Sequence, residues 1–178
     1  MEASAETLRV NDIALHGFAA TAEGPPGALE IEVRSGGIET PQTGPIADLS
    51  ARGQVDARRA PKLMLSAFEA VVRDNEARLT EPARFTFDNG VAVENLRLAW
   101  GAEGAVALDG AFSETRWRAD AVLTDFNIPD ADGQITANIA LDTDAKTPAK
   151  GGFRLRSLLL KEEEPGIDGR FIWDGKAV

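Results

Sequence analysis

The sequence predicts an all-β fold, an antiparallel sheet of about ten or more short strands. Apolar and polar residues alternate with a period of two in many runs along the 178-residue chain. Asp-Gly, Asn-Gly, Gly-Gly and Pro stand between the runs, and these residues suit the tight turns of hairpins. New runs begin about every 10–15 residues, which is the spacing of a meander.

Each run supports one strand. In order, the clearest are ALEIEVRS (28–35), FTFDNGVAVENLRLAW (85–100, with a turn at Asp88-Asn89-Gly90), EGAVALDGAF (103–112), TRWRADAVLTDFNI (115–128), QITANIALD (134–142), FRLRSLLL (153–160) and RFIW (170–173). Where the alternation slips by one residue, as before Phe126, we expect a β-bulge. We interpret SGG at 35–37 and the Asp109-Gly110 pair as turns between runs.

The segment at 61–79, PKLMLSAFEAVVRDNEARL, permits two interpretations. Leu65, Phe68 and Val72 have the i, i+3, i+7 spacing of a short helix. The alternative is a strand with Leu63, Leu65 and Ala67 in phase, then a bulge, then a hairpin around Asp74-Asn75. We favour the strand.

One apolar face per strand gives a sheet with one apolar side and one polar, solvent-exposed side. The sheet can hide its apolar side by packing on a second sheet, by closing into a barrel, or by curling around something apolar. Small inward residues such as Ala119, Ala121 and Ala137 leave room for an occupant and favour the curled, open form over a filled β-sandwich. The residues that we expect to line such a groove are Leu29, Ile31, Val33, Phe85, Phe87, Val91, Val93, Leu96, Leu98, Trp100, Val106, Leu108, Trp117, Leu123, Ile135, Ile139, Leu141, Phe153, Leu155, Phe171 and Trp173.

Composition excludes several classes of function. A net charge of −10 and a pI near 4.6 disfavour nucleic acids and anionic membrane surfaces as partners. The absence of cysteine excludes thiol catalysis, disulfides and Cys-based zinc sites. The first ten residues show no signal peptide, and no window has the roughly 20 apolar residues of a membrane span. We therefore expect either a cytoplasmic protein or a piece of a longer one.

The sequence offers little material for catalysis. His16 is the only histidine, and we interpret it as an ordinary strand-end residue. PDADG at 129–133 is the best candidate for a calcium loop, but it lacks the spacing of an EF-hand and suits a hairpin better. No nucleotide-binding or G-x-S-x-G motif is present. We expect a non-catalytic protein without a cofactor or metal.

The stretch LTEPARFTFDNGVAVENLRLAWGAEGAVALDGAF, with the SETRWRADAVLTDFNIPDADGQITANIALDTD that follows it, resembles the TamB family of AsmA-like envelope proteins. The shared pattern is an apolar strand ending in Pro, a strand closed by Asn-Gly, an amphipathic strand and a Gly-rich turn. The likeness is clearest over 79–142 and is weaker from about 46 to 178. Residues 1–45 are compatible with the family pattern but do not show it. The loop after FNIP is shorter than in the family, and 143–152 is more linker-like.

The resemblance implies a fold and a setting. TamB-like proteins are long, anchored in the inner membrane of diderm bacteria, and cross the periplasm as a curled "β-taco" sheet with a hydrophobic groove. They are associated with phospholipid passage to the outer membrane, and with autotransporter assembly beside an outer-membrane barrel partner, TamA. Residues 1–178 would be a single periplasmic segment near the C-terminal region, with phospholipid acyl chains as its ligand.

Two alternatives remain open at this stage. The segment could be a scaffold that adds strands of outer-membrane proteins or autotransporters to its sheet edge. It could also be a closed β-sandwich that acts as a binding module.

Overall fold

The fold was analysed in a computed structural model, which describes residues 1–10, 13–39, 46–113, 116–127, 133–144, 149–157 and 167–173. The described residues are almost entirely β-strand, which confirms the all-β prediction. The strands are β1 (Glu2–Val10), β2 (Ile13–Glu23), β3 (Leu29–Glu39), β4 (Ile46–Asp56), β5 (Lys62–Val72), β6 (Asn75–Leu79), β7 (Ala83–Thr86), β8 (Val91–Trp100), β9 (Gly104–Phe112), β10 (Arg116–Asn127), β11 (Gly133–Asp144), β12 (Ala149–Ser157) and β13 (Ile167–Trp173).

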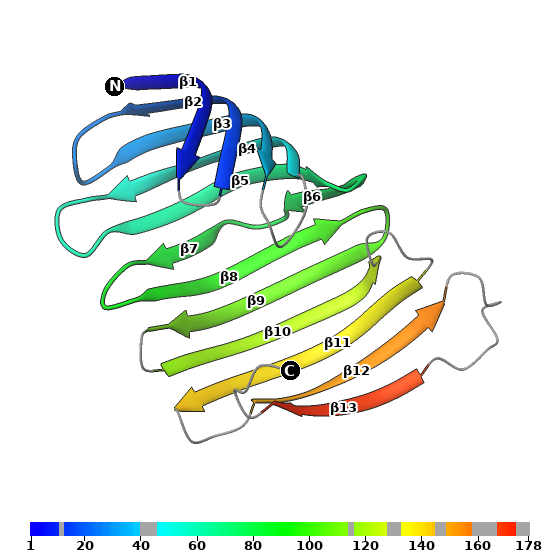
Figure 1. Ribbon diagram of the computed structural model, residues 1–178. Coiled ribbons are helices and arrows are strands. Elements are labelled where there is room, and N and C mark those ends of the chain that lie inside the picture. The colour runs from blue at the N-terminus through cyan, green and yellow to red at the C-terminus, as the bar shows by residue number, and fades with distance from the viewer. Residues whose placement is uncertain are drawn as a thin grey trace.

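All 13 strands belong to one antiparallel sheet in chain order (Figure 1). Extensive contacts between described strands occur only between hydrogen-bonded neighbours, so no second sheet packs on the first. The sheet twists and curls along its length, as Figure 1 shows. The β-sandwich alternative therefore does not describe this fold. Among the described residues there is no helix of the length and hydropathy that a membrane crossing requires.

The strand ends form two long borders of the curled sheet, which we call lip A and lip B. Lip A carries the turns that follow Glu23, Asp56, Thr86 and Phe112. Lip B is the border at which β1, β3, β5, β8 and β10 end, at Val10, Glu39, Val72, Trp100 and Asn127. Each strand other than β6 and β7 crosses from one lip to the other, so the inner face runs as a trough between them.

One position in the sheet is shared by two short strands. β6 pairs with the lip B end of β5 and of β8, whereas β7 pairs with the lip A end of both. The connection at residues 80–82 breaks the strand at this point, and Pro82 has no N–H to give to the ladder. This position therefore behaves as a strand cut in two near its middle.

Bulges bend several strands. β4, β8 and β10 each carry one extra residue relative to a neighbour, and the left-handed positions at these sites are Asp48 (φ 48°), Asn95 (φ 59°) and Asp125 (φ 43°). Asp and Asn tolerate this conformation better than other non-glycine residues. β5 carries a fourth bulge at Ser66. Bulges increase the bend and twist of a sheet, so these sites account for the curl. The slip before Phe126 confirms the expected bulge.

The segment at 61–79 is a strand hairpin, as favoured, with two differences in detail. The bulge lies at Ser66, so Ala67 is exposed rather than in phase with Leu65. The turn residues are Arg73 and Asp74, both with positive φ, one position earlier than predicted.

Two predicted turns are wrong. SGG at 35–37 lies inside β3, and Asp109-Gly110 lies inside β9. Gly110 faces the inner side between Val93 and Ala119, and a Cβ placed on it would come within 3.0 Å of the Phe112 ring. Glycine stands there because a Cβ would also lie 2.8 Å from the Arg118 backbone carbonyl oxygen of β10. By contrast, Asn89-Gly90 is a turn as predicted, with φ of 54° and 140°.

Candidate functional site

The inner face of the sheet is the candidate site. Directly opposed residues of antiparallel strands lie on the same face, so the register shows which side chains share it. One row across the sheet runs Leu79, Leu98, Val106, Leu123 and Ala137. A parallel row runs from Leu29 through Val55, Leu63, Phe85 and Val93 to Gly110 and Ala119. The face is apolar from strand to strand.

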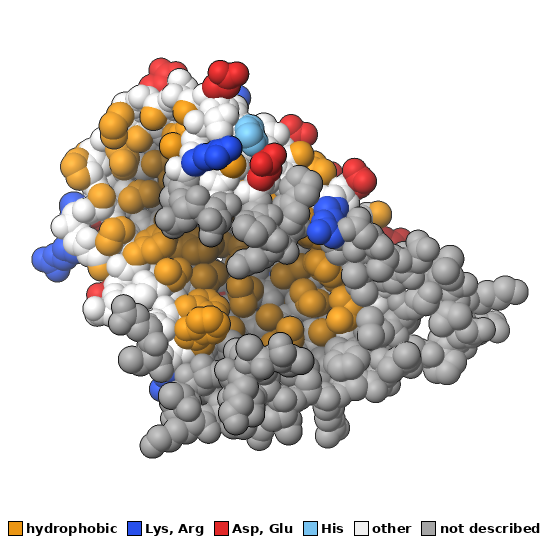
Figure 2. Space-filling model, viewed as in Figure 1, with side chains coloured by type: hydrophobic (Ala, Val, Ile, Leu, Met, Phe, Trp, Pro, Cys, Tyr) orange, Lys and Arg blue, Asp and Glu red, His pale blue; other side chains and the backbone are white. Residues whose placement is uncertain are grey.

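Figure 2 shows hydrophobic side chains gathered over a hollowed face, with charged side chains around its margin. The chain has an accessible surface of 12132 Å². A compact monomer of 19.0 kDa would expose about 8,400 Å². The difference, on the order of 3,700 Å², is surface that a two-layered fold would have buried.

The register places the predicted groove residues of the described strands on this one face. Leu29, Ile31, Val33, Phe85, Leu96, Leu98, Val106, Leu108, Leu123, Ile135 and Ile139 are half-buried, Val93 and Trp100 are buried, and Phe87, Val91 and Trp117 are exposed at lip A. The side chains of Leu141, Phe153, Leu155, Phe171 and Trp173 lie outside the described residues. Their backbones continue the same rows, opposite Ala119, Ala137, Ile135, Gly151 and Ala149.

Sequence reasoning missed part of the face. The most buried side chains are small: Ala83 lies opposite Leu65, and Ala70 lies opposite Ala77. Phe68 and Phe112 also lie on this face. The period-two pattern could have found Phe112, which is in phase with Leu108. Alanine gives no such signal, because it occurs on both faces.

At lip B, Trp100 is packed at the border of the inner face. Its ring stacks on Phe126, with ring centroids 4.5 Å apart and an interplanar angle of 18°. Its indole N–H donates to the backbone carbonyl of Asn127 at 3.0 Å. Only 8% of the residue's surface is exposed. Its polar edge is satisfied and its flat face contributes to the trough wall.

At lip A, the corresponding corner is open. Trp117 meets Phe112 edge to face, with centroids 6.1 Å apart, and its indole N–H donates to the Ser113 carbonyl at 3.1 Å. Trp117 remains 49% exposed. The two lips therefore present aromatic side chains in different states, one packed and one available for contact.

The outer face is wet and charged. Arg97 donates to Asp109 at 2.7 Å, Arg84 lies 3.3 Å from Glu94, and Glu32 pairs with two arginines, Arg34 and Arg52. The hydrogen bond from Arg34 is the main cause of the lowered pKa of Glu32. The backbone N–H of Asn95, followed by the Arg97 side chain, lowers the pKa of Asp109. Exposed pairs of this kind contribute little each, and they keep the outer face soluble.

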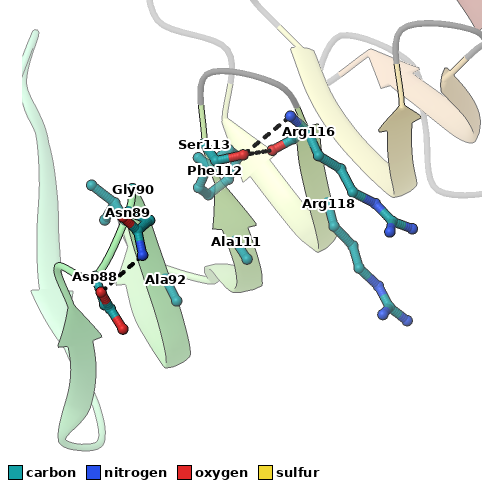
Figure 3. A pocket seen from close by; sticks show the side chains of 10 residues that line it. Asp88, Asn89, Gly90, Ala92, Ala111, Phe112, Ser113, Arg116 and Arg118 are labelled. Atoms are coloured by element: carbon teal, nitrogen blue, oxygen red, sulfur yellow. Dashed lines mark hydrogen bonds between the residues drawn. The ribbon is translucent and has the colours of Figure 1, made fainter.

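A separate pocket of about 310 Å³ opens at lip A between β8, β9 and β10. Figure 3 shows Arg116 and Arg118 extending side by side from β10, with Ala92 and Ala111 nearby. In the backbone register, Arg116 and Arg118 of β10 lie opposite Asp144 and Asp142 of β11.

The residues considered for chemistry do not assemble into a centre. Nε2 of His16 lies 3.5 Å from Glu39 Oε1 but makes no hydrogen bond among the described residues. No group of three or more His, Cys, Asp or Glu residues suited to a metal occurs in the part of the chain that the structure describes. PDADG at 129–133 lies outside the described residues except for Gly133.

Comparisons of this chain with protein-family models, with curated proteins and with solved structures find no match.

Proposed function

We propose that this chain is a non-catalytic segment of a groove that conducts phospholipid between the two membranes of a diderm bacterium, with acyl chains on its inner face. The observation that carries the proposal is the uncovered apolar face between Leu29 and Ile139, which no second layer of the described structure covers. The TamB resemblance supplies the setting, a periplasmic segment of an inner-membrane-anchored protein with a TamA-like barrel partner.

The energetics favour an acyl chain as the occupant. Exposing hydrocarbon to water costs about 0.8 kcal/mol per CH₂, so a chain of about 15 carbons costs on the order of 10 kcal/mol. A trough lined by successive strand faces offers apolar contact along its whole length. Its lining repeats from strand to strand, so no single position is a deep trap and the ligand can slide.

The small residues of the lining also support the proposal. Its floor contains alanines, and also glycines at which a Cβ would meet a backbone carbonyl oxygen of the next strand, that of Arg118 at Gly110 and that of Met64 at Gly53. Small floor residues leave space above the floor for an occupant. A filled core would place large side chains at these sites.

The test is photocrosslinking in cells. A photoreactive amino acid is placed at the inner positions Leu98 and Ile139, and at Asn138 and Glu94 on the outer face, in a chain produced in the periplasm of a diderm host. Asn138 is a matched control because it is the immediate neighbour of Ile139 and points to the opposite face. Phospholipid adducts at Leu98 and Ile139 alone are the expected result.

The second candidate function is the strand-docking scaffold. The observation in its favour is that β1 ends the strand order, with one edge unpaired among the described strands. An edge strand offers free N–H and C=O groups to another chain. Protein adducts near β1, with no lipid at Leu98 or Ile139, would replace the lipid proposal by this one.

A further inference from the structure

The floor of the trough contains a line of interruption that crosses three neighbouring strand positions. It consists of the Ser66 bulge in β5, the break at 80–82 between β6 and β7, and the Asn95 bulge in β8, and we call it the crease. On one side of the crease β6 pairs with β5 and β8, and on the other side β7 does so. β6 therefore belongs to lip B, and β7 to lip A.

The crease interrupts the regular ladder. β6 reaches β8 only through residues 77–79, and β7 only through residues 84–86. Two further bonds from Thr80 cross to β8, its N–H and its hydroxyl both donating to the Arg97 carbonyl at 2.9 and 3.1 Å. A sheet bends most easily where ladder bonds are missing and bulges coincide.

A polar cluster on the outer face bridges the crease. The side-chain amide of Asn95 donates to Glu81 Oε2 and to the Pro82 carbonyl, both at 3.2 Å. The backbone N–H of Asn95 donates to Asp109 Oδ1 at 2.6 Å, and Arg97 holds the other oxygen of this carboxylate at 2.7 Å. We call these residues the latch. They join the broken strand to β8 and β9 at the point where the backbone ladder does not.

We propose that the crease is a hinge between lip A and lip B, and that the latch around Asn95 sets the width of the trough. Bending at the crease moves β6 with lip B and β7 with lip A, so the lips approach or separate along the part of the trough formed by β5 to β8. The inference does not depend on what occupies the trough.

The test measures the distance between the lips. The chain has no cysteine, so two introduced cysteines carry spin labels without background. Arg59→Cys at lip A and Glu103→Cys at lip B form a pair across the crease, and both residues are exposed. Glu23→Cys with Arg59→Cys forms a control pair within lip A. The readout is the distance distribution from electron–electron dipolar coupling.

The perturbing variant is Asn95→Gly. Glycine accepts the φ of 59° at this site, so the bulge is kept and the side-chain bonds of the latch are lost. Asn89→Gly is the matched control, because Asn89 also has a positive φ, 54°, and lies in a turn away from the crease. Asp109→Asn is a second latch variant that preserves side-chain shape.

We expect Asn95→Gly to widen the distribution of the cross-crease pair, Asp109→Asn to widen it less, and neither to alter the pair within lip A. Circular dichroism establishes that each variant is folded, and Asp109→Asn carries the test if Asn95→Gly does not fold. An unchanged cross-crease distribution in the folded latch variants would overturn the hinge. Equal widening in Asn89→Gly would also overturn it, because the effect would then be general loosening.

Discussion

Trp100 and Trp117 offer a direct comparison of the two lips. Trp100→Ala removes a ring that is 8% exposed, stacked on Phe126 at 4.5 Å and hydrogen-bonded to Asn127. Deleting a buried tryptophan costs about 3–5 kcal/mol of unfolding free energy. Within this cost, the ring stack contributes about 0.5–1.5 kcal/mol in addition to the burial of apolar surface, and the hydrogen bond contributes about 1 kcal/mol. We expect a total loss near the lower end of that range, because no second layer packs on the ring.

Trp117→Ala is the control, since Trp117 is 49% exposed and its ring contact is edge to face at 6.1 Å. We expect a loss of roughly 1–2 kcal/mol, in proportion to the smaller buried area. Urea unfolding followed by circular dichroism measures both values. Equal losses in the two variants, or a loss under about 1 kcal/mol for Trp100→Ala, would refute the description of lip B as packed and lip A as open.

Three further predictions concern the inner face, a turn and the latch. Leu98→Asp should reduce lipid adducts and lipid passage several-fold, because the aspartate places a charge against hydrocarbon. Glu94→Lys on the outer face should leave both near wild type. Equal effects in the two folded variants would argue against the groove. Gly90→Ala should destabilise the chain by about 1–3 kcal/mol in urea unfolding, because φ is 140° and its Cβ would meet the Phe112 carbonyl oxygen. Because folding lowers the pKa of Asp109, its carboxylate stabilises the fold above the unfolded pKa, and this contribution is lost as pH falls through the folded value. Asp109→Asn should therefore lower the unfolding free energy measured in urea at pH 7 by under about 1 kcal/mol, since the side chain is 47% exposed, and the difference from wild type should shrink in acid.

The period-two pattern predicted the fold class and the shared face because both follow from local alternation. Bulges made the secondary structure of individual segments harder to predict. The spacing of Leu65, Phe68 and Val72 suggested a helix because the extra residue at Ser66 shifts the phase by one, and a bulged strand then shows the i, i+3, i+7 spacing. One-residue insertions in a strand are not distinguishable from helical spacing over so short a window.

The turn predicted at Asp109-Gly110 was wrong for a different physical reason. Asn89-Gly90 is a turn, whereas Gly110 is a strand residue beneath an aromatic ring, and both follow an Asp or Asn. The difference lies in the neighbouring strand β10, where the Arg118 carbonyl oxygen would lie 2.8 Å from a Cβ at position 110. Such cross-strand demands are not contained in the local sequence. For the same reason the bonds of Asn95 to Glu81 and Asp109 could not be predicted.

The order of the strands has a consequence for how such a protein changes in length. Within the described ranges, extensive contacts join only neighbouring strands, so the fold is in effect one-dimensional, as in repeat proteins. With β6 and β7 sharing one position, 12 strand positions at about 4.8 Å each give a trough of roughly 50 Å along the sheet. Adding or deleting one hairpin would change this length by about 10 Å and would leave the remaining cross-section unaltered. Gene duplication of a hairpin would therefore extend the trough without redesign of its walls.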